Sequence, residues 1–192
     1  MSIKEKFLNS AKELKNIYSL APLGMLLALR IILGIFANST MALFSYTIKI
    51  SFNLLPISIA GVMFGPIGAG IVGAVGDILS FFINSAGQPY FPGFTLNGLI
   101  TGLIFGLFLY KNNTKVKNIV IAAIINTVFV EIFLSSIWLY FIYGQGNDSI
   151  YIYFLLTRFI SETIKAVPIT LLIIPLCKIT KRIPTPKNNR QV

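Results

Sequence analysis

The chain has 192 residues, of which 55% are hydrophobic and only 11% are charged, and its mean hydropathy is +0.80. Soluble globular domains carry about 25% charged residues, so this composition excludes a soluble enzyme, a disordered chain and a disulfide scaffold. With no histidine and a single cysteine, the chain also lacks a His-based triad and a His-ligated metal site. We expect an all-α integral membrane protein, one domain over residues 1–192, that is not an enzyme and needs no cofactor or metal.

Residues 1–18 form the first predicted element, an amphipathic helix that lies on the membrane surface. Its apolar side chains recur at intervals of three and four residues, which defines one helix face: Ile3, Phe7, Ala11, Leu14 and Tyr18. No small-residue cleavage site follows a short apolar core, so a removable targeting segment is not expected. The alternative interpretation is a mobile, solvated tail.

Six membrane spans are predicted after this segment. A spanning helix needs about 20 mostly apolar residues, and adjacent glycine and proline interrupt helices. Cutting the charge-free runs at such places gives spans at about 20–38, 50–64, 66–84, 95–110, 118–142 and 150–177. The cut between the second and third spans falls at Gly65 and Pro66.

Basic residues set the expected orientation of the bundle. They gather at the N-terminus, in the loop between the fourth and fifth spans and in the tail at 178–192, whereas the other side has only Lys49. The positive-inside rule therefore places both termini, including the basic tail, in the cytoplasm. The formal net charge of +10 is thus a topology signal and gives no support to nucleic-acid binding.

Glycines at four-residue spacing predict close helix packing, because small residues let helix backbones approach in lipid. The fourth span has Gly98, Gly102 and Gly106, and the third is also rich in glycine. The first span carries Gly24 and Ala28, again four apart. This small-residue patch could face the bundle or an external partner helix, and periodicity does not decide between them.

Six ionisable residues fall deep inside the predicted spans, where they are costly and point to function. They are Arg30, Asp77, Glu131, Arg158, Glu162 and Lys165. Arg158 and Glu162 share a helix face at i, i+4, and Arg30 could pair with Asp77. Two interpretations stay open: buried ion pairs that join helices, or a polar pocket, open to the outside, for a charged and aromatic ligand.

The loop over residues 85–95 favours the pocket. Prolines and glycines stiffen it, and Tyr90, Phe91 and Phe94 are suited to cover a flat ring. Anchoring of these rings at the membrane interface is the alternative. Neither a nucleotide-binding GxxxxGK[ST] loop nor an HExxH motif is present, so the chain alone has no visible means of hydrolysing ATP.

The glycine-rich stretch from Ile57 to Leu79, followed by the stretch from Tyr90 to Leu96, resembles the S-components of energy-coupling factor (ECF) vitamin transporters, most of all their folate-specific branch. The resemblance implies a six-helix bundle with an outward-facing site in the bacterial plasma membrane. It also implies partnership with a transmembrane coupling subunit and two cytoplasmic ATPases. In that family a small-residue patch on the first helix docks on the coupling subunit, which matches Gly24 and Ala28.

Folate chemistry fits these residues. The pterin ring presents an amino group and a ring N–H side by side, and one carboxylate can accept both. Asp77 or Glu162 could read the ring, while Arg30 and Arg158 could hold the ligand's carboxylates or neutralise those acids. The expected substrate-binding residues are Arg30, Asp77, Tyr90, Phe91, Phe94, Asn97, Arg158 and Glu162. The alternatives are an S-component for another vitamin, such as thiamin or riboflavin, a stand-alone secondary transporter or channel, and a membrane-embedded enzyme.

Overall fold

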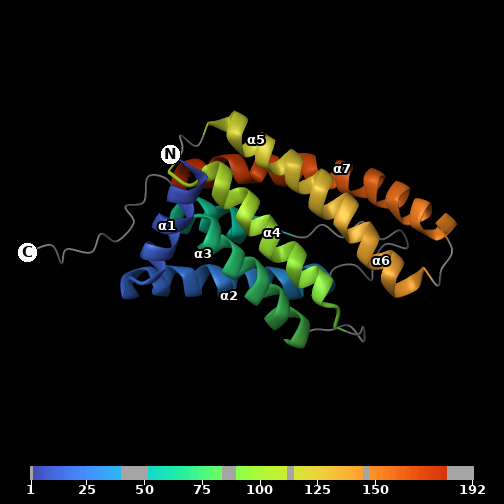
Figure 1. The fold of residues 1–192 in the computed structure, drawn as a ribbon, viewed down its shortest axis with the longest axis horizontal. Helices are drawn as coiled ribbons and strands as arrows, with labels where there is room; N and C mark the ends of the chain where they lie inside the picture. Colours follow the sequence, from blue (N-terminus) through green and yellow to red (C-terminus); the bar gives the residue numbers. More distant parts are fainter. Residues whose placement is uncertain (1, 40–51, 84–89, 112–114, 145–147, 181–192) are drawn as a thin grey trace, which may run out of the picture.

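A computed structural model describes residues 2–39, 52–83, 90–111, 115–144 and 148–180. Every regular element in these ranges is a helix (Figure 1), which confirms the all-α prediction. Lys49, residues 50–51 of the second predicted span, residues 85–89 of the aromatic loop and the tail from 181 lie outside the described residues.

Eight helical elements follow one another in the described residues. Their bounds are α1 Ile3–Leu14, α2 Ile17–Ser39, α3 Leu54–Ile83, α4 Pro92–Leu109, α5 Val116–Ile125, the π-helix η2 Asn126–Leu134, α6 Ser135–Tyr143 and α7 Asp148–Thr180. Figure 1 shows α5 and α6 as parts of one continuous rod that runs beside α7.

Five described stretches are long and apolar enough to cross a membrane, one fewer than the six predicted. The difference arises in α3, which joins two predicted spans but contains a break at Gly65, where φ is 75° and ψ is −165°. Glycine adopts this positive φ without strain, and Pro66 then starts the next helical part, where its missing N–H costs nothing. The part from Leu54 to Phe64 is roughly 16 Å long, about half of the hydrocarbon core.

α3 lies at the centre of the bundle, where it packs against α1, α2, α4 and α7. Its contact with α4 is a contact between backbones. A Cβ atom on Gly98 would lie 2.6 Å from the carbonyl oxygen of Gly73, and a Cβ atom on Gly102 would overlap the backbone of Ala69. The prediction that the glycine ridges pack tightly inside the bundle is therefore confirmed.

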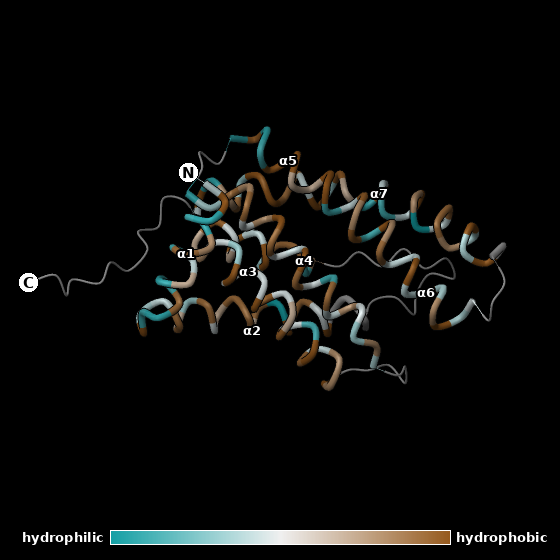
Figure 2. The backbone as a smooth tube through the Cα atoms, in the orientation of Figure 1, coloured by the Kyte–Doolittle hydropathy of each residue, from teal (hydrophilic) through white to brown (hydrophobic). Residues whose placement is uncertain are grey.

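The outer surface of the bundle is apolar. In α2 and in α7, only 22% of the apolar spanning stretch is buried inside the chain. The exposed residues of these helices include Met25, Leu156 and Leu171. Hydrophilic residues gather instead at the end formed by α1 and the start of α5 (Figure 2). An apolar belt of this kind is what contact with lipid requires.

α1 contacts the bundle through polar side chains. The Lys6 ammonium donates a 2.6 Å hydrogen bond to the carbonyl oxygen of Leu107, and burial lowers the pKa of Lys6 below its ordinary value. The Ser10 hydroxyl lies at the break in α3, where it donates to the carbonyl oxygen of Phe64 and accepts from the N–H of Ile67. These contacts fix α1 across the point where α3 changes direction.

Only part of the apolar stripe predicted for residues 1–18 packs on the bundle. Leu14 packs against a core cluster of α2 and α3 residues. Ile3, and Tyr18 at the start of α2, keep more than half of their surface exposed, so these ends of the stripe stay available to lipid. The position of α1 on the membrane surface remains a prediction.

Candidate functional site

Arg30 and Asp77 form the ion pair between α2 and α3 that the sequence suggested. The distance from Arg30 Nη2 to Asp77 Oδ1 is 3.9 Å, and Arg30 is only 5% exposed. Gly76 makes room for the arginine, since a Cβ atom there would lie 2.6 Å from Arg30 Cδ. The absence of a side chain at this position of α3 thus lets a guanidinium lie deep in the bundle.

Asp77 also anchors the start of α4. The Thr95 hydroxyl donates a 2.8 Å hydrogen bond to Asp77 Oδ2, and it lies 2.8 Å from the Tyr90 hydroxyl. Because the single proton of Thr95 is directed at the carboxylate, Tyr90 is the donor in the second bond. The Tyr90 ring stacks on Phe82 at 6.2 Å and lies 5.2 Å from Phe81.

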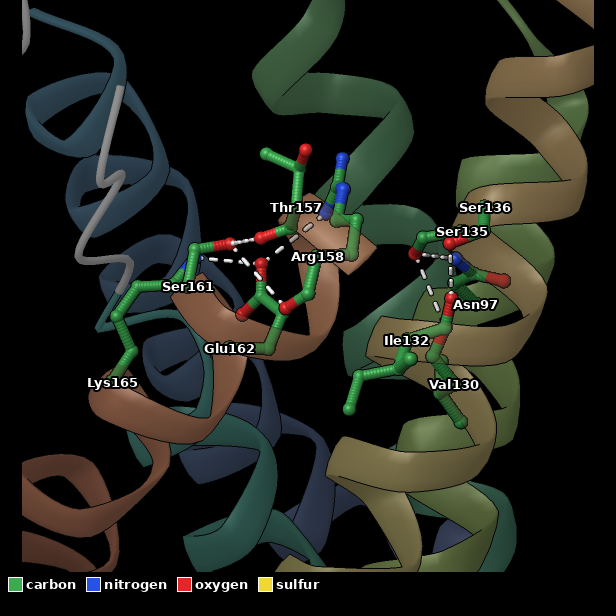
Figure 3. Close-up of polar contacts among 10 residues, drawn as sticks. All are labelled: Asn97, Val130, Ile132, Ser135, Ser136, Thr157, Arg158, Ser161, Glu162 and Lys165. Carbon is green, nitrogen blue, oxygen red and sulfur yellow. Dashed lines mark hydrogen bonds and ion pairs between the residues drawn. The ribbon is translucent and has the colours of Figure 1, made fainter. Parts of the chain in front are cut away.

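Aromatic and amide side chains form a second group on the other side of the first turns of α4. Trp138 Nε1–H donates to Asn97 Oδ1 at 2.9 Å. Asn97 Nδ2 in turn donates to the Ser135 hydroxyl at 2.9 Å (Figure 3). The Phe91 ring lies 5.7 Å from Trp138 and 6.0 Å from Phe94. This network joins α4 to α6 and holds three aromatic planes next to one another.

The third group lies on α7. Glu162 Oε1 accepts from Lys165 Nζ at 2.6 Å and pairs with Arg158 Nη1 at 3.3 Å (Figure 3). The i, i+4 pair predicted from the sequence is confirmed, and Lys165 adds a shorter bond to the same oxygen. Glu162 is therefore a carboxylate that two cations of its own helix already neutralise.

Glu131 on η2 connects these groups electrostatically. It interacts with Arg30 of α2 and with Arg158, Glu162 and Lys165 of α7. η2 packs against α7 and α4, and Glu131 is half-buried.

The structure thus connects the predicted site residues within three groups. Arg30, Asp77 and Tyr90 are joined through Thr95, and Phe91, Phe94 and Asn97 are joined around Trp138. Arg158 and Glu162 pair only with each other and with Lys165 among the contacts described. Sequence reasoning did not assign Thr95, Ser135 or Trp138 to the site, although Thr95 lies in the stretch from Tyr90 to Leu96 that carries the resemblance. It singled out Lys165 and Glu131 as deep charges without giving them a part in binding.

The small-residue patch of α2 faces away from the bundle. Gly24 and Ala28 are exposed, and a Cβ atom on Gly24 would meet no atom within 4 Å. The sequence pattern did not decide whether this patch faces the bundle or an external partner. In the isolated chain it faces outward, since neither residue takes part in internal packing.

Comparison with known proteins agrees with this arrangement. Residues 19–177 match the family model described as "ECF transporter, substrate-specific component". The chain is 38% identical over 117 residues to the folate transporter FolT of Clostridium novyi (strain NT), and 28% identical over 127 residues to that of Leuconostoc mesenteroides. These alignments cover 61% and 66% of this chain, and the chain spans 65% of the length of each relative.

A solved structure extends the likeness to the fold. The crystal structure of FolT bound with folic acid superposes with a TM-score of 0.65 at 32% identity, covering 82% of this chain and 93% of that one. The match of the family model to most of the chain, together with the apolar helical bundle, shows that the chain belongs to the family of ECF transporter substrate-specific components.

Proposed function

We propose that this chain is the folate-binding subunit of an ECF-type importer, which captures folate from outside the cell and delivers it with an ATP-driven coupling module. Membership of the substrate-specific component family supports the first half of this proposal. The two relatives named as folate transporters, and the similarity to a FolT structure bound with folic acid, support folate as the ligand.

The observation that carries the proposal is that α4 begins between an aromatic group and a buried cation. Thr95 faces the Asp77–Arg30 pair, and Asn97, two residues later, holds Trp138 beside Phe91. A flat pterin ring needs aromatic planes on which to stack, and an anionic ligand is favoured by a buried guanidinium in its site. Both requirements are met by side chains around one helix end.

Binding can be measured with the protein's own fluorescence, because the chain has a single tryptophan and that tryptophan belongs to the proposed site. We expect folic acid to quench Trp138 emission in a saturable titration of the detergent-solubilised protein, with neither ATP nor partners added. Mass spectrometry of ligand that co-purifies provides an independent identification. Saturable binding of thiamin or riboflavin, with none of folic acid, would replace the substrate and leave the family assignment intact.

The coupling module is the second half of the proposal. We infer a transmembrane coupling subunit and two cytoplasmic ATPases as partners in a bacterial plasma membrane, with both termini of this chain in the cytoplasm. The exposed patch at Gly24 and Ala28 supports the inference, because small residues on a lipid-facing helix allow a partner helix to approach closely. Co-purification with affinity-tagged protein from its native membrane tests it.

A further inference from the structure

The segment that carries Glu131 has an unusual winding. Residues Asn126–Leu134 form a π-helix, and the N–H of Ser135 accordingly bonds to the carbonyl oxygen of Val130, five residues earlier. π-helical turns are rare and occur frequently at functional sites. Residues five apart point about 140° away from each other in an α-helix, whereas i→i+5 bonding brings them toward one face.

The winding places Glu131 toward the face that begins with Asn126. Asn126 is 1% exposed, and neither atom of its side-chain amide has a hydrogen-bond partner among the described residues. Buried amides without partners are uncommon in folded proteins and indicate a site that a ligand or water completes.

Of the three acids deep in the spans, Glu131 is the one to which the described residues donate no hydrogen bond. Asp77 accepts from Thr95 and pairs with Arg30, while Glu162 pairs with two cations of α7. Glu131 makes neither a hydrogen bond nor an ion pair within the part of the chain that the structure describes. A carboxylate at this depth is costly without hydrogen bonds. A ligand that donates hydrogen bonds would therefore stabilise Glu131 more than it would stabilise Asp77 or Glu162, which already have partners.

An unsatisfied donor on Arg30 independently indicates that a ligand binds near Glu131. The Nε–H of Arg30 is buried and has no acceptor among the described residues, although the guanidinium is held beside Asp77. The Arg30 guanidinium on α2 thus interacts electrostatically with the Glu131 carboxylate on η2, and neither Arg30 Nε–H nor Glu131 has a hydrogen-bond partner among the described residues. A ring with donors beside an acceptor atom can satisfy both, as the edge of a 2-amino-4-oxopteridine does.

We propose that Glu131, rather than Asp77 or Glu162, accepts the paired N–H donors of the pterin ring, and that Arg30 Nε–H donates to an acceptor atom of the same ligand. This assignment rests on the proposed function, because it presupposes that the ligand is a pterin. It makes η2 the element that sets specificity and leaves Asp77 as the counter-ion that positions Arg30.

The test compares ligands that differ by one donor. Wild-type protein should bind 2-desamino folic acid, which lacks the amino donor, at least about tenfold more weakly than folic acid. Glu131→Gln replaces one acceptor atom by a donor and should weaken folic acid binding by at least about thirtyfold. The variant should also lose the preference for the amino group, while its preference for folic acid over pteroic acid, which lacks the glutamate tail, stays unchanged.

Controls separate binding from folding. Glu5→Gln, on the exposed side of α1, removes the same charge and should leave folic acid affinity unchanged. Without ligand, Glu131→Gln should unfold at the same temperature as wild type or higher, because a carboxylate without hydrogen bonds has gone. Asp77→Asn should unfold at a lower temperature because Arg30 loses its directly paired counter-ion.

The outcomes are distinguishable from failure of the proposed function. A Glu131→Gln protein that binds folic acid within about threefold of wild type overturns this inference. The inference is also overturned if Asp77→Asn or Glu162→Gln, instead of Glu131→Gln, abolishes the preference for folic acid over its desamino analogue. If Glu131→Gln fails to fold, equal wild-type affinity for folic acid and its desamino analogue overturns it as well. A wild-type protein that binds no folate at all contradicts the proposed function itself.

Discussion

The hydroxyl of Ser10 in α1 lies 2.5 Å from the carbonyl oxygen of Phe64, at the residue that precedes the break in α3. The same hydroxyl accepts from the N–H of Ile67 at 3.1 Å, on the other side of the break. One side chain thus replaces part of the backbone hydrogen bonding that Gly65 and Pro66 interrupt. The N-terminal helix is therefore a structural part of the bundle.

Substitution of Ser10 by alanine should destabilise the protein. It leaves the buried carbonyl of Phe64 and the N–H of Ile67 without their partner, which costs about 1–3 kcal/mol. Thermal unfolding in detergent measures the change, with Thr163→Ala as the matched control. Thr163 is exposed and its hydroxyl donates to the carbonyl oxygen of Phe159 in its own helix, so that variant should stay within about 0.5 kcal/mol of wild type. Equal effects of the two substitutions would contradict the bridging role of Ser10.

Tyr110, which follows the apolar span of α4, should make stability depend on pH in the alkaline range. Its hydroxyl donates a 2.7 Å hydrogen bond to Glu13, and burial together with this acceptor raises the pKa of Tyr110 well above its ordinary value. The unfolded chain therefore ionises first, so stability present below about pH 10 is lost as the pH rises further.

The check is the pH dependence of unfolding in Tyr110→Phe. This variant has no hydroxyl to ionise, so its decline in stability above about pH 10 should be shallower than that of wild type. Absorbance at the tyrosinate band should also show one fewer tyrosine that ionises only on unfolding. Parallel pH profiles for wild type and variant would refute the assignment.

A methyl group at Gly102 should be tolerated far less than one at Gly70, although both glycines lie at the contact between α3 and α4. A Cβ atom on Gly102 would overlap the backbone of Ala69, whereas on Gly70 the nearest atoms lie 3.6 Å or farther away. Gly102→Ala should cost about 1–3 kcal/mol through overpacking, while Gly70→Ala gains up to about 1 kcal/mol of helix propensity. Thermal or denaturant unfolding of the pair measures the difference, and equal stabilities would mean that α4 can shift away from α3.

Leucine at Gly24 or Ala28 should abolish uptake and leave folate binding intact. Both residues are exposed on α2, so the larger side chain has room within this chain but would separate a partner helix from it. Uptake of labelled folate by cells reports on the partner, and Trp138 titration of the purified variant reports on binding. If binding is lost together with uptake, the patch serves the bundle and the proposed docking surface is wrong.

The ion pair on α7 and the break in α3 could be predicted from the sequence because each has a local signature. Arg158 and Glu162 stand one helical turn apart, and an adjacent glycine and proline at 65–66 interrupt a helix whatever surrounds them. Depth alone suggested Arg30 and Asp77 as partners, since charges in lipid must find each other.

Other features depend on tertiary structure and leave no such signature. The π-helix at Asn126–Leu134 has the same apolar composition as an ordinary span, so nothing in the pattern reveals the change of winding beside Glu131. The bond from Trp138 to Asn97 joins residues 41 positions apart. The apolar periodicity of α1 also gives no sign that Lys6 and Ser10, on the polar side of this helix, donate hydrogen bonds to the bundle.

The six ionisable side chains deep in the spans sum to zero: Arg30, Arg158 and Lys165 balance Asp77, Glu131 and Glu162. The empty bundle is therefore electroneutral at its centre, which limits the cost of keeping these groups in lipid. A ligand whose tail bears carboxylates makes the loaded bundle anionic. A membrane potential that is negative inside opposes inward movement of that anion by about 2.3 kcal/mol per charge for each 100 mV. Inward delivery of folate, as proposed above, is therefore electrically uphill by that amount.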